Sequence, residues 1–294
     1  MTVVLRTIPE ARRWVRTERT SSGALGLVPT MGSFHEGHLS LIRRARQICD
    51  RTIVSIFVNP LQFAPGEDYE SYPRDFDRDL SLATQEGVDA VFHPEEGEMY
   101  PSGLVTSVGV GKLGEALCGA SRPGHFQGVA TVVAKLFHIV QPDRAFFGQK
   151  DAQQALIIRT MVLNLNWPLQ IEVCPTVREP DGVAYSSRNR RLSAEERSCA
   201  TVLYRSLRLA ESLIQSGERN VACVEQQMQK QIQKMIHAVP GAEIDYARLV
   251  DPATLEGLQQ IRGEVLAAVA VRFGKTRLID NLSIKIAPER QARG

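Results

Sequence analysis

The sequence has few cysteines and no strong excess of either charge. Its 294 residues include five scattered cysteines with no C-x-x-C pair, namely Cys49, Cys118, Cys174, Cys199 and Cys223. Neither a disulfide framework nor a zinc ribbon is expected, and a reducing cytoplasm fits best. Lys and Arg number 35 against 33 Asp and Glu, which leaves a formal net charge of +2. This balance argues against nucleic-acid binding along a basic face, because such domains usually carry a large excess of Lys and Arg.

Long apolar runs are also missing. No stretch approaches the ~18 uninterrupted apolar residues of a membrane span, since the run at 129–140 is broken by Lys135 and His138. The beginning of the sequence, Met1 to Glu10, has no apolar segment typical of a secretory signal. Hydrophobic residues make up 43% of the chain, and at roughly 150 residues per domain its length favours two domains. We therefore expect a cytoplasmic globular protein that does not enter a membrane.

Residues 1–176 alternate between short apolar segments and amphipathic ones. The segment 52–58 is rich in β-branched residues and lacks clean alternation, as a parallel strand covered on both faces does. Strands that alternate with helices imply right-handed crossovers and a parallel sheet with helices on both faces. We predict a Rossmann-like, doubly wound α/β domain, with strands at 25–28, 52–58, 88–92, 144–147 and 169–174 and helices at 7–20, 38–50, 74–86, 127–140 and 152–163.

A different order of elements begins after Thr176. The run Ser193-Ala194-Glu195-Glu196 is a capping box, which opens a helix predicted to continue to about residue 215. A second helix is predicted at 221–237, and strands follow at 243–250, 264–273 and 277–286. Helices followed by a run of antiparallel strands indicate a separate and smaller C-terminal α+β domain over residues 177–294.

The strongest local signal is His35-Glu36-Gly37-His38, between the first predicted strand and its helix. Two imidazoles at this i, i+3 spacing face the same direction, and the backbone N–H groups of a helix start favour an anion. Gly37 leaves room for a ligand to approach the backbone closely. The arrangement suits a polyphosphate, although the motif alone is equally compatible with two solvent-exposed histidines near a loop.

Two further loops follow predicted strands. Lys150, in the run 147–154, is placed to neutralise phosphate. Asp151 can cap the next helix, hold ribose hydroxyls, or do both. Gln154 lies one turn into that helix, where its amide could orient a substrate hydroxyl or carboxylate. Gln62 follows the second predicted strand, so it lies at the same rim, where open α/β sheets bind ligands. Without a ligand, Gln62 would be an ordinary turn residue.

The run Tyr185-Ser186-Ser187-Arg188 follows the predicted parallel sheet. Two hydroxyls followed by a guanidinium can form a flexible anion clamp. A solvated basic loop is the alternative, and the arginines within 188–191 could also contact RNA.

Other polar residues carry weaker signals. His125 precedes a predicted helix and could reach the same site or merely cap the helix. Asp75, Asp77 and Asp79 alternate along a helix that is expected to be exposed. Their spacing does not support a magnesium site.

Together, the histidine pair and the later Ser/Lys/Arg loop resemble the HIGH-type nucleotidyltransferase superfamily. Within it, the chain resembles the pantothenate synthetase, or pantoate–β-alanine ligase, family. The matching segments run in order along nearly the whole chain, at 29–32, 35–38, 57–63, 121–126, 147–154, 186–189 and 275–281. Ala152 stands where the family commonly has an aromatic residue, and Gln149 where Glu is frequent. These departures concern local packing rather than the residues with chemical roles.

The resemblance implies an ATP-dependent ligase. ATP and (R)-pantoate would first give pantoyl adenylate and pyrophosphate, and β-alanine would then displace AMP to form pantothenate. The resemblance also implies Mg²⁺ carried on ATP, with no protein residue assigned to the metal, and a homodimer built through the N-terminal domain. The alternatives are a cytidylyltransferase-like enzyme of the same superfamily and an RNA-binding protein.

The family's functional residues are carried over by motif position. His38, as proton donor, His35, Lys150, Ser186 and Arg188 would be catalytic. Gln62 and Gln154 would bind pantoate, and residues 177–294 would form a lid. The ATP site would comprise Met31, Gly32, His35, Gly37, His38, Gly148, Gln149, Lys150, Asp151, Val177, Tyr185, Ser186, Ser187 and Arg188.

Overall fold

The computed structural model describes residues 1–19, 23–101 and 105–286. The chain divides into two compact units, Met1–Val177 and Arg178–Gly294, and each builds its own sheet. All five cysteines are reduced thiols. Among the helices of the described ranges, none is both long and apolar enough to cross a membrane.

The first unit is built on a six-stranded sheet in the order β1-β4-β3-β2-β5-β6, paired in parallel throughout. Leu27 of the central strand β2 pairs with Ile53 on one side and with Ala145 on the other. The predicted parallel sheet is therefore confirmed. The strands are β1 (Val3–Leu5), β2 (Leu25–Thr30), β3 (Arg51–Ile56), β4 (Ala90–Phe92), β5 (Arg144–Gly148) and β6 (Gln170–Cys174).

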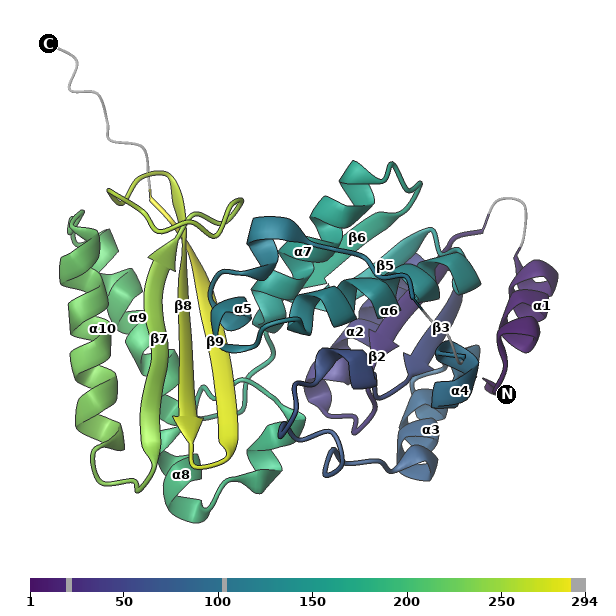
Figure 1. Ribbon diagram of the computed structural model, residues 1–294, viewed down its shortest axis with the longest axis horizontal. Helices are drawn as coiled ribbons and strands as arrows, with labels where there is room; N and C mark the ends of the chain where they lie inside the picture. Colours follow the sequence, from purple (N-terminus) through teal and green to yellow (C-terminus); the bar gives the residue numbers. More distant parts are fainter. Residues whose placement is uncertain (20–22, 102–104, 287–294) are drawn as a thin grey trace, which may run out of the picture. The chain divides into compact units, whose positions relative to one another are not determined.

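Helices cover both faces of this sheet (Figure 1). The longer ones are α1 (Ile8–Glu18), α2 (Glu36–Ile48), α3 (Phe76–Gln85), α6 (His125–Val140) and α7 (Ala152–Asn164). Shorter turns connect them, namely α4 (Glu96–Met99), α5 (Cys118–Ser121) and the 3₁₀ turns η1 (Pro60–Gln62), η2 (Gly111–Gly114) and η3 (Gln149–Asp151). The start of α1 is fixed by a capping box between Thr7 and Glu10.

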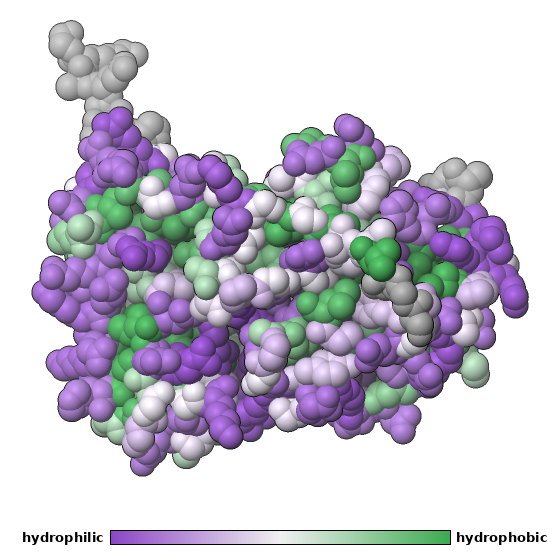
Figure 2. All heavy atoms as spheres, in the orientation of Figure 1, coloured by the Kyte–Doolittle hydropathy of each residue, from purple (hydrophilic) through white to green (hydrophobic). Residues whose placement is uncertain are grey.

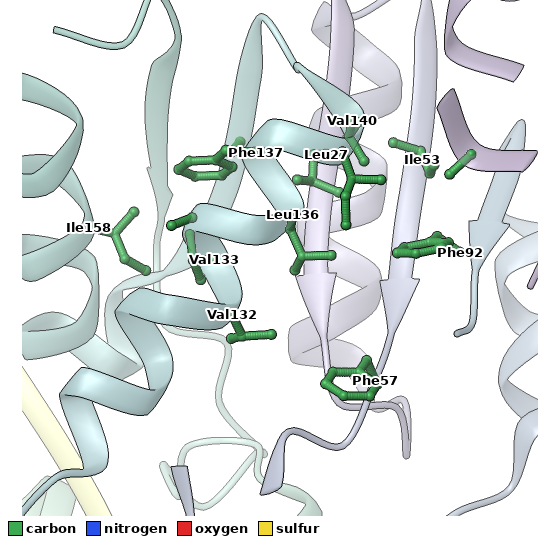
Figure 3. Close-up of a cluster of buried hydrophobic side chains, with 14 of the residues drawn as sticks. Leu27, Ile53, Phe57, Phe92, Val132, Val133, Leu136, Phe137, Val140 and Ile158 are labelled. Atoms are coloured by element: carbon green, nitrogen blue, oxygen red, sulfur yellow. The ribbon is translucent and has the colours of Figure 1, made fainter. Parts of the chain in front are cut away.

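Successive residues of β2 point into two separate cores. Leu27 packs into the cluster formed with α6, and Figure 3 shows it beside Leu136 and Val140 of that helix. Val28 packs into the cluster formed with α2 on the opposite face. Both side chains are fully buried, which explains the continuous apolar sequence of this strand.

The second unit pairs two long helices with a three-stranded antiparallel sheet, in the order β7-β8-β9. Its elements are η4 (Ser187–Arg191), α8 (Ala194–Cys199), α9 (Thr201–Gln215), α10 (Val221–Ile236), β7 (Ala242–Val250), β8 (Glu264–Phe273) and β9 (Thr276–Lys285). The turn between β8 and β9 contains Gly274 at φ +52°, a conformation that glycine adopts without strain. The predicted smaller α+β fold is confirmed.

The single helix predicted after Ser193 is wrong in one respect, because it is divided at Ala200. The Ser193–Glu196 capping box is present, but the Leu203 N–H donates to the Ala200 carbonyl at 3.2 Å, only three residues back. This tightened turn interrupts the α-helical ladder. A periodic sequence pattern does not show such a change.

The surface carries scattered hydrophobic residues among mainly hydrophilic ones on the face drawn in Figure 2.

A buried and an exposed leucine form a matched pair of variants that tests the assignment of the core. We predict that Leu27→Ala lowers the free energy of unfolding by about 2–5 kcal/mol, because Leu27 is 0% exposed. Leu163→Ala should change it by less than about 0.5 kcal/mol, because Leu163 is 74% exposed. Urea unfolding followed by circular dichroism measures both, and equal losses would contradict the assignment of Leu27 to the core.

Candidate active site

The ends of β2 and β5 mark a switch in the direction of the chain. From β2 the chain passes through α2 to β3 on one side, and from the neighbouring β5 it passes through α7 to β6 on the other. Open α/β sheets bind ligands outside the carboxyl ends of their strands at such a point. The loop after β2 ends at His35 and leads into the first turn of α2, which carries His38, and the turn after β5 carries Lys150 and Asp151. The two predicted phosphate motifs therefore flank the same switch point.

The two histidines form a stacked pair at the start of α2. His35 is the N-cap residue of the helix, and the rings of His35 and His38 stack with centroids 4.0 Å apart. The ring of Phe34 lies 5.6 Å from that of His38. The imidazoles therefore face the same direction, as their spacing predicts, and the pair is supported from behind by a buried aromatic ring.

The environment of His38 keeps its imidazole neutral. Its Nδ1 atom is buried and has no hydrogen-bond partner within the described part of the chain. Burial lowers the pKa of His38 from its ordinary value of 6.5 to about 4, opposed by the negative charge of Asp151 and assisted by the positive charge of Lys150. At neutral pH, His38 thus offers one N–H donor rather than a full charge. Lys150 and Asp151 therefore lie near enough to His38 to act on it electrostatically.

Lys150 supplies the full positive charge that His38 lacks. Its Nζ lies 3.4 Å from Oδ1 of Asp151, and both side chains are partly exposed. Asp151 occupies the N-cap position of α7, but its side chain makes no capping hydrogen bond to the helix. Gly148 precedes this pair, and a Cβ added there would meet nothing within 4 Å. Space is therefore open beside the end of β5.

Gln62 is held in place by Asn59 and contacts Met31. The Asn59 side chain donates to Oε1 of Gln62 at 3.0 Å and to the Gly128 carbonyl at 3.1 Å. Nε2 of Gln62 lies 3.1 Å from Sδ of Met31, which joins a predicted substrate residue to a predicted nucleotide residue. The sequence interpretation missed Asn59, whose 1% exposure reflects its role in fixing Gln62. The signal available in the sequence was an asparagine directly before a proline at the end of a predicted strand.

His125 supports the same turn from the start of α6. Its Nδ1 lies 2.7 Å from the Gln62 carbonyl, and Nη1 of Arg122 lies 3.0 Å from its Nε2. Since a carbonyl accepts and a guanidinium donates, the ring carries its proton on Nδ1. Gly128 lets α6 approach closely, because a Cβ there would lie 2.1 Å from the Leu61 carbonyl oxygen. His125 thus acts through Gln62 rather than as a simple helix cap.

Gln154 lies in the first turn of α7 and is partly exposed. Its neighbour Gln153 is buried and its amide donates to the carbonyls of Leu113 and Ala116. Of these two glutamines, Gln154 is the one available to a ligand.

Four predicted nucleotide residues lie in the second unit, namely Tyr185, Ser186, Ser187 and Arg188, and Val177 ends the first unit. Ser186 is the N-cap of η4, and its hydroxyl accepts from the Arg188 N–H at 3.3 Å. Tyr185 and Ser187 flank it in the sequence. The predicted anion clamp is therefore a capped turn rather than an extended loop.

The described ranges contain no group of three or more His, Cys, Asp or Glu residues placed to hold a metal ion.

A model of the pantoate–β-alanine ligase family matches residues 3–283 of the chain. The chain belongs to this family. Pantothenate synthetase of Moorella thermoacetica is 55% identical over 283 residues, which cover 96% of this chain and 99% of that protein. Pantothenate synthetase of Syntrophomonas wolfei is 52% identical over 284 residues, again 96% of this chain and 99% of that protein.

Solved structures of pantoate–β-alanine ligases share the fold. Pantothenate synthetase of Thermus thermophilus superposes with a TM-score of 0.87 at 46% identity, covering 96% of this chain and 99% of that one. The ligase of Francisella tularensis, complexed with β,γ-ATP and β-alanine, superposes with a TM-score of 0.79 at 33% identity, covering 96% of this chain and 97% of that one. The Rossmann-like core with its smaller C-terminal sheet is thus that of the ligase family.

One prediction about the acidic helix of this ligase is wrong. Asp77 is exposed and Asp75 caps α3 through the Arg78 N–H, but Asp79 is buried at 1% exposure. The helical periodicity turns Asp79 inward, where its carboxylate accepts the N–H groups of Ser33 and Phe34. Alternating residues do not share one face of a helix, so the three carboxylates are not equally exposed.

The lowered pKa of His38 predicts a dependence of stability on pH. Between about pH 6.5 and 4 the unfolded chain binds a proton at this residue and the folded chain does not, so stability rises with pH in this window. The contribution is complete above pH 6.5 and is lost as the pH falls towards 4. Urea unfolding across this range should show a shallower dependence for His38→Gln than for wild type.

The exposed His237 provides the control, since His237→Gln should keep the wild-type dependence. Parallel curves for wild type and His38→Gln would contradict the desolvated, neutral state of His38.

Proposed function

We propose that this chain is an ATP-dependent ligase that condenses pantoate with β-alanine through an enzyme-bound pantoyl adenylate. The observation that carries the proposal is that His38 and Lys150 follow the neighbouring strands β2 and β5 at the switch point of the sheet, in a chain of the pantoate–β-alanine ligase family. ATP and β-alanine are supported as substrates by the Francisella ligase complex.

In the first half-reaction, a carboxylate oxygen of pantoate attacks the α-phosphorus of ATP. A new P–O bond forms, the bond to the bridging oxygen breaks, and pyrophosphate leaves with its electron pair. Negative charge grows on the phosphoryl oxygens during this step. Lys150 offsets it with a full charge, while His35 and His38 donate N–H groups from fixed positions. A preorganised donor of this kind is worth about 3–4 kcal/mol of transition-state stabilisation.

In the second half-reaction, the β-alanine nitrogen attacks the carbonyl carbon of the adenylate. The bond between that carbon and the phosphate oxygen breaks, AMP leaves with this oxygen, and the amine loses a proton. Gln62 and Gln154 would hold pantoate through both steps, and Asn59 keeps Gln62 in place. A site closed to water protects the adenylate from hydrolysis.

Gly148 and Asp151 would contact the ribose, and Met31, Gly32, Gly37 and Gln149 would line the nucleotide site. Val177 would meet adenine, and Tyr185, Ser186, Ser187 and Arg188 would contact the phosphates. Residues 1–176 are proposed as the catalytic domain and residues 177–294 as a C-terminal lid domain. ATP is proposed to arrive with Mg²⁺, which neutralises phosphate charge. We further propose a cytoplasmic homodimer.

Pyrophosphate and AMP release with ATP, pantoate and Mg²⁺, with and without β-alanine, tests the reaction. We expect stoichiometric pyrophosphate without β-alanine, and continuous AMP and pantothenate formation once it is added. AMP formation independent of β-alanine, or no turnover, would contradict the ligase. Pyrophosphate release with a phosphorylated alcohol and no AMP would indicate a nucleotidyltransferase instead, and salt-dependent RNA affinity without turnover would indicate an RNA-binding protein.

Two alanine variants, one at Lys150 and one at a control lysine, test the positive charge assigned to the site. Lys150→Ala should reduce kcat for pyrophosphate release by about 10²-fold or more, because it removes the cation beside His38. Lys112→Ala is the control, since Lys112 is exposed on η2 and should leave kcat unchanged. Near-normal turnover of folded Lys150→Ala would remove Lys150 from the mechanism.

A further inference from the structure

The carboxylate of Asp79 binds the loop that precedes the histidine pair. The residue lies on α3, and its Oδ2 accepts the N–H of Ser33 at 2.6 Å while its Oδ1 accepts the N–H of Phe34 at 2.7 Å. Each carboxylate oxygen therefore has its own backbone donor. Such a fork fixes both the position and the direction of two successive peptide groups.

The loop held by this carboxylate has an unfavourable backbone conformation. Gly32 has φ +80° and Ser33 has φ +53°, so two successive residues occupy the left-handed region. A residue other than glycine adopts that region at an energetic cost and persists there only when its surroundings hold it. A Cβ on Gly32 would lie 2.8 Å from Oδ2 of Asp79. The carboxylate and the loop therefore fit each other closely.

Helix α3 holds the carbonyl of the same loop as well. Nη1 of Arg78 donates to the Phe34 carbonyl at 3.1 Å and lies 3.7 Å from Oδ1 of Asp79. Both the N–H and the C=O of Phe34 are thus bound from one helix. Phe34 is fully buried and its ring contacts that of His38. The next residue is His35, so the position of Phe34 determines where both imidazoles lie.

We propose that Asp79 is a positioning residue for adenylation, holding the 31–34 loop in the conformation that directs His35 and His38 towards the phosphates of ATP. This inference rests on the proposed function. The Asp79 carboxylate already accepts the N–H groups of Ser33 and Phe34. These two groups are therefore not free to bind a phosphate of ATP, which would contact the imidazoles and Lys150 instead. Burial raises the pKa of the Asp79 carboxyl, and the N–H groups of Phe34 and Ser33 oppose that shift.

Asp79→Asn is the most direct test. The amide keeps the shape of the carboxylate, but its NH₂ group must face a backbone N–H, so two donors meet at hydrogen-bond distance. A displacement of the loop by about 1 Å should lower kcat for pyrophosphate release by about 10²-fold. KM for pantoate should change much less than kcat, because Asn59 still holds Gln62 and Gln154 lies on α7. The control is Asp77→Asn, an exposed position on the same helix, which should leave both constants unchanged.

The titration of His38 provides a readout that does not depend on activity. Histidine-labelled protein followed by NMR, with the His38 signal assigned by its loss in His38→Gln, should show wild-type titration near pH 4. In Asp79→Asn the pKa of His38 should rise towards 6.5, because the released loop admits water around the His38 ring. The other groups near this ring, namely His35, Lys150 and Asp151, are unchanged in the variant. Asp77→Asn should titrate as wild type does.

Folded Asp79→Asn with wild-type kcat and wild-type His38 titration would overturn the proposal. A shifted titration, in a protein whose wild type forms no pantothenate, would refute the proposed reaction while supporting the placement of His38 by Asp79. If Asp79→Asn does not fold, Arg78→Ala is the second test of the proposal. This variant should fold, because the Arg78 side chain is 39% exposed and Asp79 still binds the loop. It should lower kcat by about 3–10-fold, as the loss of one hydrogen bond does, and raise the His38 titration. The absence of both effects would then overturn the proposal.

Discussion

The parallel pairing of β2 with both β3 and β5 is the constraint on which the site depends. Because the chain leaves the ends of β2 and β5 in opposite directions, two loops far apart in the sequence meet where no connection covers them. The apolar residues of β2 secure this arrangement by packing into the α6 core on one face and the α2 core on the other. Without the double burial of β2, the histidine and lysine loops would not share one location.

The electrostatics of the site follow from this meeting of loops. Burial of His38 makes it neutral, so the cationic charge comes from Lys150, while the imidazoles contribute oriented donors. A bound polyphosphate would stabilise the protonated form of His38 and raise its pKa again. The same histidine can thus be a neutral hydrogen-bond donor before ATP binds and be protonated, with a positive charge, more of the time in its presence. Asp79 and Asn59 play similar structural roles. Each is buried, and each forms a hydrogen bond that holds a loop next to a proposed functional side chain.

The sequence predicted the fold class and the polar residues that follow β2 and β5, because strand–helix alternation and polar residues after strands are local patterns. It did not reveal β1, whose three residues are too few to show periodicity. The division of the C-terminal helix at Ala200 depends on a single tightened turn. The burial of Asp79 escaped prediction for a different reason: its partners, the amides of Ser33 and Phe34, lie 46 and 45 residues away. A carboxylate that binds backbone groups of a distant loop has no sequence signature.

The central claim, that a pantoate oxygen attacks the α-phosphorus at this switch point, is tested most directly by isotope transfer. Pantoate labelled with ¹⁸O in both carboxylate oxygens, incubated with ATP, Mg²⁺ and β-alanine, should yield AMP that carries one ¹⁸O atom, because the attacking oxygen stays on phosphorus when the amine cleaves the C–O bond. Mass spectrometry of AMP and pyrophosphate measures this. Unlabelled AMP, or label in the pyrophosphate, would contradict an acyl-adenylate and with it the roles given to His38 and Lys150.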